Sequence, residues 1–409
     1  MLVRDVFVEL RSRLRSCNVF ITTGAKLNDN CNLKINIQPG CITLNYYEGL
    51  GQRRGSLSSI ESLSDCCSEE EECSDSASIA FDGHCQLIPN SMSCLKIGGG
   101  TISFRILTRP KGGDFFTELV PAGGPSETLE SKEPKVCVEP GRDTAFSCAN
   151  CSNKVTEGRV KFDRVLELPT TSLDASEWFC HGHDAVGTCD LAPKPKSADF
   201  LYRLTHFVVN ATALSPKTNR FNAKREVYHC ERCLAWLGVK ERDGVKLFNC
   251  ELMLHQDDWC GRVFLHGFQT ADCVVDDFVY TIERLTREAN LGLQYSVMCR
   301  IVLECAFASA SKRYLLVWVM DRRLEVLRRK DSVDGRVSLQ SSFLTKILYR
   351  VEGSLNEEVE SWLADPAVVS ADISKAMFCR GVEHLRSTSQ KVPESFRSAN
   401  GFSVSYLKV

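Results

Sequence analysis

Short stretches in the first 110 residues alternate between apolar and polar side chains. Turn-forming residues such as Pro39-Gly40 and Gly98-Gly99-Gly100 separate these stretches. Successive side chains of a strand point to opposite faces of a sheet, so the alternation predicts strands with one buried face. We therefore expect residues 1–110 to form an antiparallel β sandwich or barrel. Its strands are expected within residues 6–10, 33–37, 41–46, 93–97 and 101–107.

Two segments lack this alternation. Residues 55–82 are rich in serine and acidic side chains, with four consecutive glutamates at 69–72, and cannot bury a core. They predict a disordered, solvated insertion in the N-terminal β domain. Residues 111–143 combine Gly, Pro, Ser and Lys, which is typical of a linker. A β-rich middle region, residues 144–269, follows, with one buried strand expected at 200–209.

The last part of the chain, residues 270–409, mixes helical and strand periodicities. Phe278, Ile282 and Leu285 lie at i, i+4 and i+7, which predicts an amphipathic helix over 276–288. Ser354 begins a capping box for a second helix, and residues 372–385 predict a third. Strands are expected at 297–303, 314–320, 324–327 and 402–406, with Asp321-Arg322-Arg323 as a hairpin turn. The fold class is therefore α+β, with an α+β C-terminal region.

The charge and apolar content of the chain exclude several classes of function. A net charge of −2 gives no basic field, so we expect neither nucleic-acid binding nor attachment to an acidic membrane. The longest apolar runs, such as residues 314–320, are far shorter than the roughly 20 residues that span a bilayer. The first residues lack the apolar core of a secretory signal, which predicts a cytoplasmic protein, with the nucleus as a second location left open. In such a reducing compartment the 21 cysteines are not expected to form disulfides.

Two Cys-x-x-Cys pairs carry the strongest chemical signal. Cys148 and Cys151 form the first pair, and Cys230 and Cys233 form the second. Each pair follows an aromatic residue and precedes a β-prone stretch, which is the layout of a zinc knuckle. Four thiolates complete a tetrahedral Zn²⁺ shell, so we predict one structural zinc that joins two halves of a fold. Two unrelated knuckles, or thiols buried as small hydrophobic groups, are the alternatives.

A second group of metal-type side chains lies between the pairs. Cys180, His181 and His183 are close in sequence, with Cys189 as a further donor. They could hold a second metal, or form a loop whose neighbouring Trp178 fills the core. Enzyme templates are missing from the sequence: it has no Gly-rich phosphate loop, GxSxG elbow or HExxH helix. A closed Cys₄ shell leaves no coordination position for a substrate, which argues against zinc hydrolase chemistry.

The order of several landmarks resembles the HECT-like family of proteins that bind ubiquitin-conjugating enzymes and are described as ubiquitin-protein ligases. The resemblance covers about residues 144–409, with a looser match of the N-terminal sheet. The landmarks are Phe-Ser-Cys-Ala-Asn-Cys at 146–151, Arg-Val-Leu at 164–166, Glu-Trp-Phe-Cys-His at 177–181, the strand 199–210, Cys-Glu-Arg-Cys at 230–233, Tyr-Leu-Leu-Val-Trp at 314–318 and the tail 402–408.

The resemblance implies a ubiquitin-protein transferase that accepts ubiquitin from a conjugating enzyme and passes it to substrates or to itself. The implied partners are the conjugating enzyme, ubiquitin, and substrates of the cyclin or mRNA-processing type. The family places the enzyme contact shortly after the second knuckle, here roughly residues 248–270, and the activity in a HECT-like tail, here about 372–409. Relatives are also linked to pre-mRNA 3′-end processing, so a non-catalytic zinc-containing binding or maturation factor is the alternative.

Ubiquitin transfer through a thioester would need an accessible cysteine with a stabilised thiolate. Cys379 lies in the HECT-like tail, next to Arg380 and one helical turn after Lys375, although it could equally face the core. Cys180 is the rival, because His181 and His183 could act as its base. Apolar neighbours predict that four other thiols are buried: Cys250, Cys273, Cys299 and Cys305. Direct transfer from the conjugating enzyme would need neither candidate.

Overall fold

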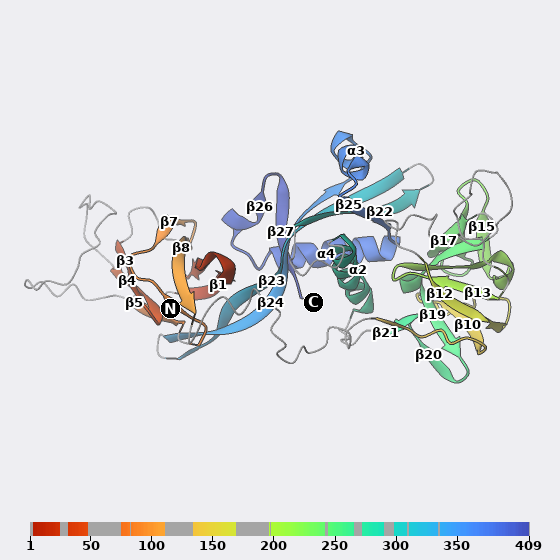
Figure 1. Ribbon diagram of the computed structural model, residues 1–409, viewed down its shortest axis with the longest axis horizontal. Helices are drawn as coiled ribbons and strands as arrows, with labels where there is room; N and C mark the ends of the chain where they lie inside the picture. Colours follow the sequence, from red (N-terminus) through yellow and green to blue (C-terminus); the bar gives the residue numbers. More distant parts are fainter. Residues whose placement is uncertain are drawn as a thin grey trace, which may run out of the picture.

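The computed structural model describes residues 3–24, 32–47, 75–81, 83–110, 134–168, 196, 198–241, 244–265, 272–289, 298–308, 311–333 and 336–408. Its regular structure is mainly β-strand, with three α-helices among the described residues. Figure 1 shows a long sheet that runs from the N-terminal strands to the helices, and a smaller β module at the opposite end. Among all the residues that the structure describes, no helix is long and apolar enough to cross a membrane.

A 14-stranded sheet joins the two ends of the chain. Its main path runs in the order β3-β4-β5-β24-β23-β1-β2-β8-β6. The N-terminal strands are β1 (Val3–Arg11), β2 (Ser16–Thr23), β3 (Asn32–Gln38), β4 (Cys41–Tyr47), β5 (Asp75–Ala80), β6 (Cys85–Leu87), β7 (Ser93–Gly98) and β8 (Thr101–Pro110). The C-terminal strands are β22 (Cys299–Ala308), β23 (Ser311–Val333), β24 (Arg336–Glu352), β25 (Val368–Asp372), β26 (Ser398–Ala399) and β27 (Phe402–Leu407).

The long hairpin β23–β24 connects the N-terminal strands to the C-terminal region (Figure 1). β1 pairs with β23, and β5 pairs with β24. Leu327 and Val337 of this hairpin are buried in the same core as the N-terminal strands. The β-rich fold predicted for residues 1–110 is confirmed in part: these strands form a barrel-like sheet, but β23 and β24 belong to the same sheet. The apolar faces of the N-terminal strands are completed by strands that follow more than half a chain later.

Helices cover both faces of the C-terminal part of the sheet. α2 (Cys273–Ala289) and α4 (Lys375–Ser389) pack together on one face, over apolar side chains of β22–β24. α3 (Glu357–Ala364) packs on the other face through Val359 and Trp362. The three predicted helices are confirmed, although α3 is capped by Asn356, whose side chain accepts a hydrogen bond from Val359 N–H at 2.9 Å, and not by Ser354.

Three local features differ from the sequence prediction. Asp321-Arg322-Arg323 is not a turn, because β23 continues through it with irregular register on both sides of Asp321. A bulge interrupts side-chain alternation much as a turn does, so the two look alike in sequence. The expected strand at 200–209 is two antiparallel strands, β13 (Asp199–Tyr202) and β14 (His206–Asn210). Within the expected insertion, residues 75–80 form strand β5; the part before residue 75 lies outside the described residues.

The smaller module contains three sheets around one aromatic-rich core. Residues 135–136, in the expected linker, already belong to it as strand β9. The four-stranded sheet is β11 (Val160–Lys161), β10 (Asp143–Cys148), β19 (Leu252–Gln256) and β20 (Trp259–Gly261). The seven-stranded sheet is β12 (Arg164–Glu167), β13, β14, β18 (Gly244–Phe248), β17 (Trp236–Glu241), β16 (Val227–Cys230) and β15 (Asn219–Asn222). β21 (Phe264–Leu265) pairs with β9 (Lys135–Val136).

Candidate functional site

The two Cys-x-x-Cys segments fold as the same turn at the ends of two strands. At the end of β10, the Cys148 N–H donates to Asn153 O at 2.8 Å, and the Ser152 N–H donates to Cys148 O at 2.8 Å. At the end of β16, the Cys230 N–H donates to Ala235 O and the Leu234 N–H donates to Cys230 O, both at 2.9 Å. Ser152 and Leu234 share a left-handed φ of 59°. The matching bonds present each pair of thiols in the same way.

The two turns face one another and bring four sulfur atoms together. All four Sγ atoms, of Cys148, Cys151, Cys230 and Cys233, lie within 4.8 Å of one another. Cys148 Sγ is 3.6 Å from Cys233 Sγ, and Cys151 Sγ is 3.5 Å from Cys230 Sγ. These distances are far above a disulfide bond of about 2.05 Å. They are close to the edge of about 3.8 Å that a tetrahedron with Zn–S bonds of about 2.3 Å would have.

Groups around the sulfur atoms hold the two turns in register. Asn153 Nδ2, from the first turn, donates to Cys230 Sγ at 3.6 Å, and Arg232 Nη1, from the second turn, donates to Cys151 O at 3.3 Å. Cys148 and Cys230 are fully buried. Burial raises the pKa of the Cys148 thiol to about 12. A thiolate at that position therefore needs a cation beside it, and a four-thiolate donor set fits Zn²⁺.

The candidate metal centre lies between two sheets. β10 belongs to the four-stranded sheet and β16 to the seven-stranded sheet. The predicted convergence of the two cysteine pairs is therefore found, and it joins segments that residues 152–229 separate in sequence. A metal ion here would link the two sheets above the aromatic core, in which Phe146, Phe200 and Phe207 stack with ring centroids 4.6–6.2 Å apart.

Of the two thiols predicted as candidate ubiquitin acceptors, the structure describes only one. Cys379 lies on α4 with its side chain exposed, so it does not face the core, unlike its neighbour Phe378. Arg380 is engaged by carboxylates, at 2.8 Å from Asp272 and 3.7 Å from Glu383. Cys180, with His181, His183 and Cys189 of the possible second metal site, lies outside the described residues.

Most of the thiols expected to be buried are buried, with one exception. Cys250, Cys299 and Cys305 are buried as predicted. Cys273 is only half-buried, and Arg262 Nη2 lies 2.7 Å from its sulfur. The sequence prediction failed there because Cys273 is the first residue of α2 and its sulfur lies beside the charged Arg262 side chain.

One cluster of polar side chains is not predicted from the sequence. His255 Nε2 lies 2.7 Å from Ser147 Oγ and 4.0 Å from the sulfur of the exposed Cys260. The Asp257-Asp258 dipeptide between two strands is the signal that could have found it. A two-residue hairpin turn there places residue 255 opposite residue 260.

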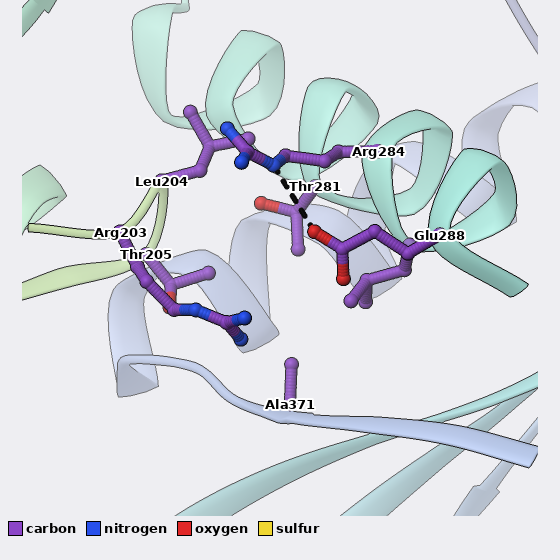
Figure 2. A pocket seen from close by; sticks show the side chains of 8 residues that line it. Arg203, Leu204, Thr205, Thr281, Arg284, Glu288 and Ala371 are labelled. Atoms are coloured by element: carbon purple, nitrogen blue, oxygen red, sulfur yellow. Dashed lines mark hydrogen bonds and ion pairs between the residues drawn. The ribbon is translucent and has the colours of Figure 1, made fainter. Parts of the chain in front are cut away.

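A small cavity lies where the β module meets α2 (Figure 2). Its volume is about 30 Å³, enough for one or two waters and too small for a substrate. Arg203 and Glu288 point into it, and Arg284 Nε is 3.2 Å from Glu288 Oε1. Arg284 also pairs with Glu167 of β12, so the cavity is part of the joint between module and helix.

Comparison with known proteins places the chain in a family. The family of HECT-like ubiquitin-conjugating enzyme (E2)-binding proteins matches residues 9–404, so the chain belongs to it and a ubiquitin-conjugating enzyme is its partner class. Two proteins that are named as E3 ubiquitin-protein ligases, one from Mus musculus and one from Homo sapiens, are each 22% identical to it. Each alignment covers 99% of this chain and 98% of the relative. No solved structure matches it.

Proposed function

We propose that the protein is a ubiquitin-protein ligase, which takes ubiquitin from a conjugating enzyme and transfers it to substrate proteins or to itself. The observation that carries the proposal is the match of the E2-binding family over residues 9–404. It is supported by relatives that bear the name of a ubiquitin ligase and align from end to end with this chain.

The proposal includes a structural zinc ion on Cys148, Cys151, Cys230 and Cys233. The four sulfur atoms already lie at distances close to those of a tetrahedral shell. Four protein donors leave no position for substrate, so the ion's contribution is to hold the two sheets together. The module then presents a rigid surface to its partner.

We propose the hairpin β19–β20 as part of the contact with the conjugating enzyme. Trp259 at its tip is 41% exposed, which is unusual for so large an apolar side chain. A Cβ on Gly261 would lie 2.5 Å from Cη2 of the Trp259 ring, so this glycine lets the indole lie against the strand. A fixed, half-exposed tryptophan is the type of side chain that dominates protein interfaces.

The test mixes the protein with activating enzyme, a panel of conjugating enzymes, ubiquitin and ATP. We expect ubiquitin chains that require this protein, formed with at least one conjugating enzyme. Trp259→Ala should weaken binding of that enzyme about 30-fold or more, because interface tryptophans contribute about 2 kcal/mol or more. Phe343 is an exposed aromatic side chain on β24 of the 14-stranded sheet, so Phe343→Ala is the matched control.

Two results would decide against the ligase. If no conjugating enzyme in a broad panel supports chain formation, transfer is excluded. Stable partners recovered in the same experiment would then favour the non-catalytic binding factor. Chain formation with unchanged affinity in the Trp259→Ala protein would keep the ligase and remove only the hairpin contact.

A further inference from the structure

The hairpin β19–β20 brings a base and a nucleophile onto one face of the module. Its strands are joined by the two residues Asp257 and Asp258, and His255 pairs directly with Cys260. Directly paired residues of antiparallel strands point to the same face, with Cβ atoms about 4.5–5.5 Å apart. On the other side of β19, β10 adds Ser147 to this face, diagonally across from His255.

These three side chains are graded from buried to exposed. Ser147 is 5% exposed, His255 is half-buried, and Cys260 is exposed. Ser147 Oγ lies 2.7 Å from His255 Nε2, and Cys260 Sγ lies 4.0 Å from the same nitrogen. Both groups therefore meet the same ring nitrogen, the hydroxyl from the inner side and the accessible thiol from the outer side.

A thiol and an imidazole nitrogen thus lie side by side, which is the pair that an activated cysteine needs, and the Ser147 hydroxyl is bonded to that same nitrogen. Three cysteines are exposed in the described part of the chain: Cys94, Cys260 and Cys379. Among these three, Cys260 alone has a histidine nitrogen in contact with its sulfur. Trp259 precedes Cys260 in the same strand, on the opposite face of the hairpin, and is also exposed.

We propose that Cys260 is the residue that accepts ubiquitin from the conjugating enzyme as a thioester, with His255 as its general base. The proposal rests on the ligase function proposed above and names the acceptor within it. Ser147 acts through His255 as a positioning residue.

The step is a transthioesterification. His255 Nε2 takes the proton of the Cys260 thiol, and the thiolate attacks the carbonyl carbon of the ubiquitin thioester on the conjugating enzyme. A bond forms between Cys260 Sγ and that carbon, and the bond from the carbon to the enzyme's cysteine sulfur breaks. The departing thiolate takes the proton from the imidazolium. While His255 carries this proton, its Nε2–H can donate a hydrogen bond to Ser147 Oγ, which lies 2.7 Å away.

The first experiment tests, in the absence of ubiquitin, whether His255 increases the reactivity of the Cys260 thiol. Iodoacetamide is added at pH 7, and mass spectrometry follows alkylation of each exposed cysteine. We expect Cys260 to react about tenfold faster than Cys94 in the same molecule, and His255→Gln to slow Cys260 by about that factor while Cys94 is unchanged. Equal rates at the two cysteines, unaffected by His255→Gln, would overturn the proposal.

The second experiment follows a single discharge of ubiquitin from a loaded conjugating enzyme, on a non-reducing gel. We expect a thiol-sensitive adduct with the wild-type protein and with Cys94→Ser. Cys260→Ser should give no adduct, or one that resists reduction because it is an oxygen ester. An adduct that is kept by Cys260→Ser and lost by Cys379→Ser would assign the acceptor to α4 instead.

The outcomes separate this proposal from the ligase function. Wild-type protein that forms chains, together with an equally active Cys260→Ser variant that still binds the conjugating enzyme, would remove Cys260 and leave the ligase in place. Wild-type protein that forms no chains with any conjugating enzyme would remove both. Loss of chains in Cys260→Ser, with a normal melting curve and normal enzyme binding, supports the proposal.

Discussion

Glu9 is a carboxylate buried inside the large sheet, where it is only 2% exposed. Lys346 Nζ on β24 lies 2.5 Å from it, Asn18 Nδ2 on β2 donates to it at 3.0 Å, and the Tyr406 hydroxyl on β27 also donates to it. These contacts tie the first strand of the chain to the last. Removing one member of a buried charged pair leaves the other uncompensated, which is costly.

We predict that Glu9→Gln lowers the free energy of unfolding by about 3–5 kcal/mol, because the Lys346 ammonium loses its counter-charge in a mostly buried position. Urea denaturation measures the change. Glu139→Gln is the matched control, since its partner Arg142 is 53% exposed and surface pairs contribute about 1 kcal/mol or less. Equal effects of the two substitutions would show that the Glu9 cluster does not stabilise the sheet.

The same cluster predicts acid sensitivity. Burial opposes ionisation of Glu9, but Lys346 and the hydrogen bond from Tyr406 outweigh it and lower the pKa of this carboxyl. A carboxyl with a lowered pKa in the folded state contributes stability that is complete above its unfolded pKa, about 4.3, and that is lost as the pH falls through the folded pKa. We expect the wild-type protein to lose more stability than Glu9→Gln between pH 5 and more acidic values, measured by thermal melts at each pH.

The four cysteines of the candidate metal centre make the next prediction at this scale. Cys230→Ser should remove stoichiometric zinc and destabilise the module by several kcal/mol, because binding of metal to a closed thiolate site is part of the folding free energy. Elemental analysis and thermal melts check it, with Cys94→Ser as the control thiol. Wild-type protein without stoichiometric zinc would contradict the metal site, as would a soluble Cys230→Ser protein with an unchanged melt.

At the scale of elements, α2 and α4 touch through a glycine. A Cβ on Gly381 would lie 2.5 Å from Cε2 of Phe278, which is fully buried in α2. Alanine is favoured over glycine in a helix by about 1 kcal/mol, yet we predict that Gly381→Ala destabilises the protein, since overpacking costs about 1–3 kcal/mol. Ser387→Ala on the exposed side of α4 should be neutral or stabilising. Urea denaturation of both variants measures the difference, and a stabilised Gly381→Ala protein would contradict the packing.

Elements with strong local periodicity were predictable, and those set by distant partners were not. Phe278, Ile282 and Leu285 identify α2 because the helix carries its own pattern. The sequence predicts a turn at Asp321 in the middle of β23, because the contacts that explain the bulge there come from other elements. Arg322 pairs with Glu283 of α2, and its carbonyl accepts a hydrogen bond from Thr345 of β24. Pairing of β1 with β23 likewise leaves no local trace.

The candidate site divides in the same way. The four cysteines could be found because a Cys-x-x-Cys turn is encoded within a few residues, and two copies suggest one metal. That residues 148 and 233 face one another depends on the packing of two sheets. His255, Cys260 and Ser147 carry no motif, and the register of β10, β19 and β20 alone brings them together.

At the scale of the molecule, the candidate metal centre lies within the β module and not in the 14-stranded sheet. A strong zinc chelator should therefore lower the melting temperature of residues 134–265 while the 14-stranded sheet keeps its own transition. Calorimetry would then show two separate transitions, and limited proteolysis would cut first within the module. Chelator saturated with zinc is the control. An unchanged single transition with chelator present would contradict a stabilising metal.

The pairing of β1 with β23 has a consequence for how the protein is made. Phe7 leaves the ribosome early, but its partner strand, which begins at Ser311, is among the last to be synthesised. At a synthesis rate of roughly 5–20 residues per second, the edge of β1 stays without its partner strand for a time on the order of tens of seconds. The β module between them can fold during that time. Nascent chains stalled before β23 should therefore need a chaperone on their N-terminal strands, and release from it should coincide with synthesis of the long hairpin.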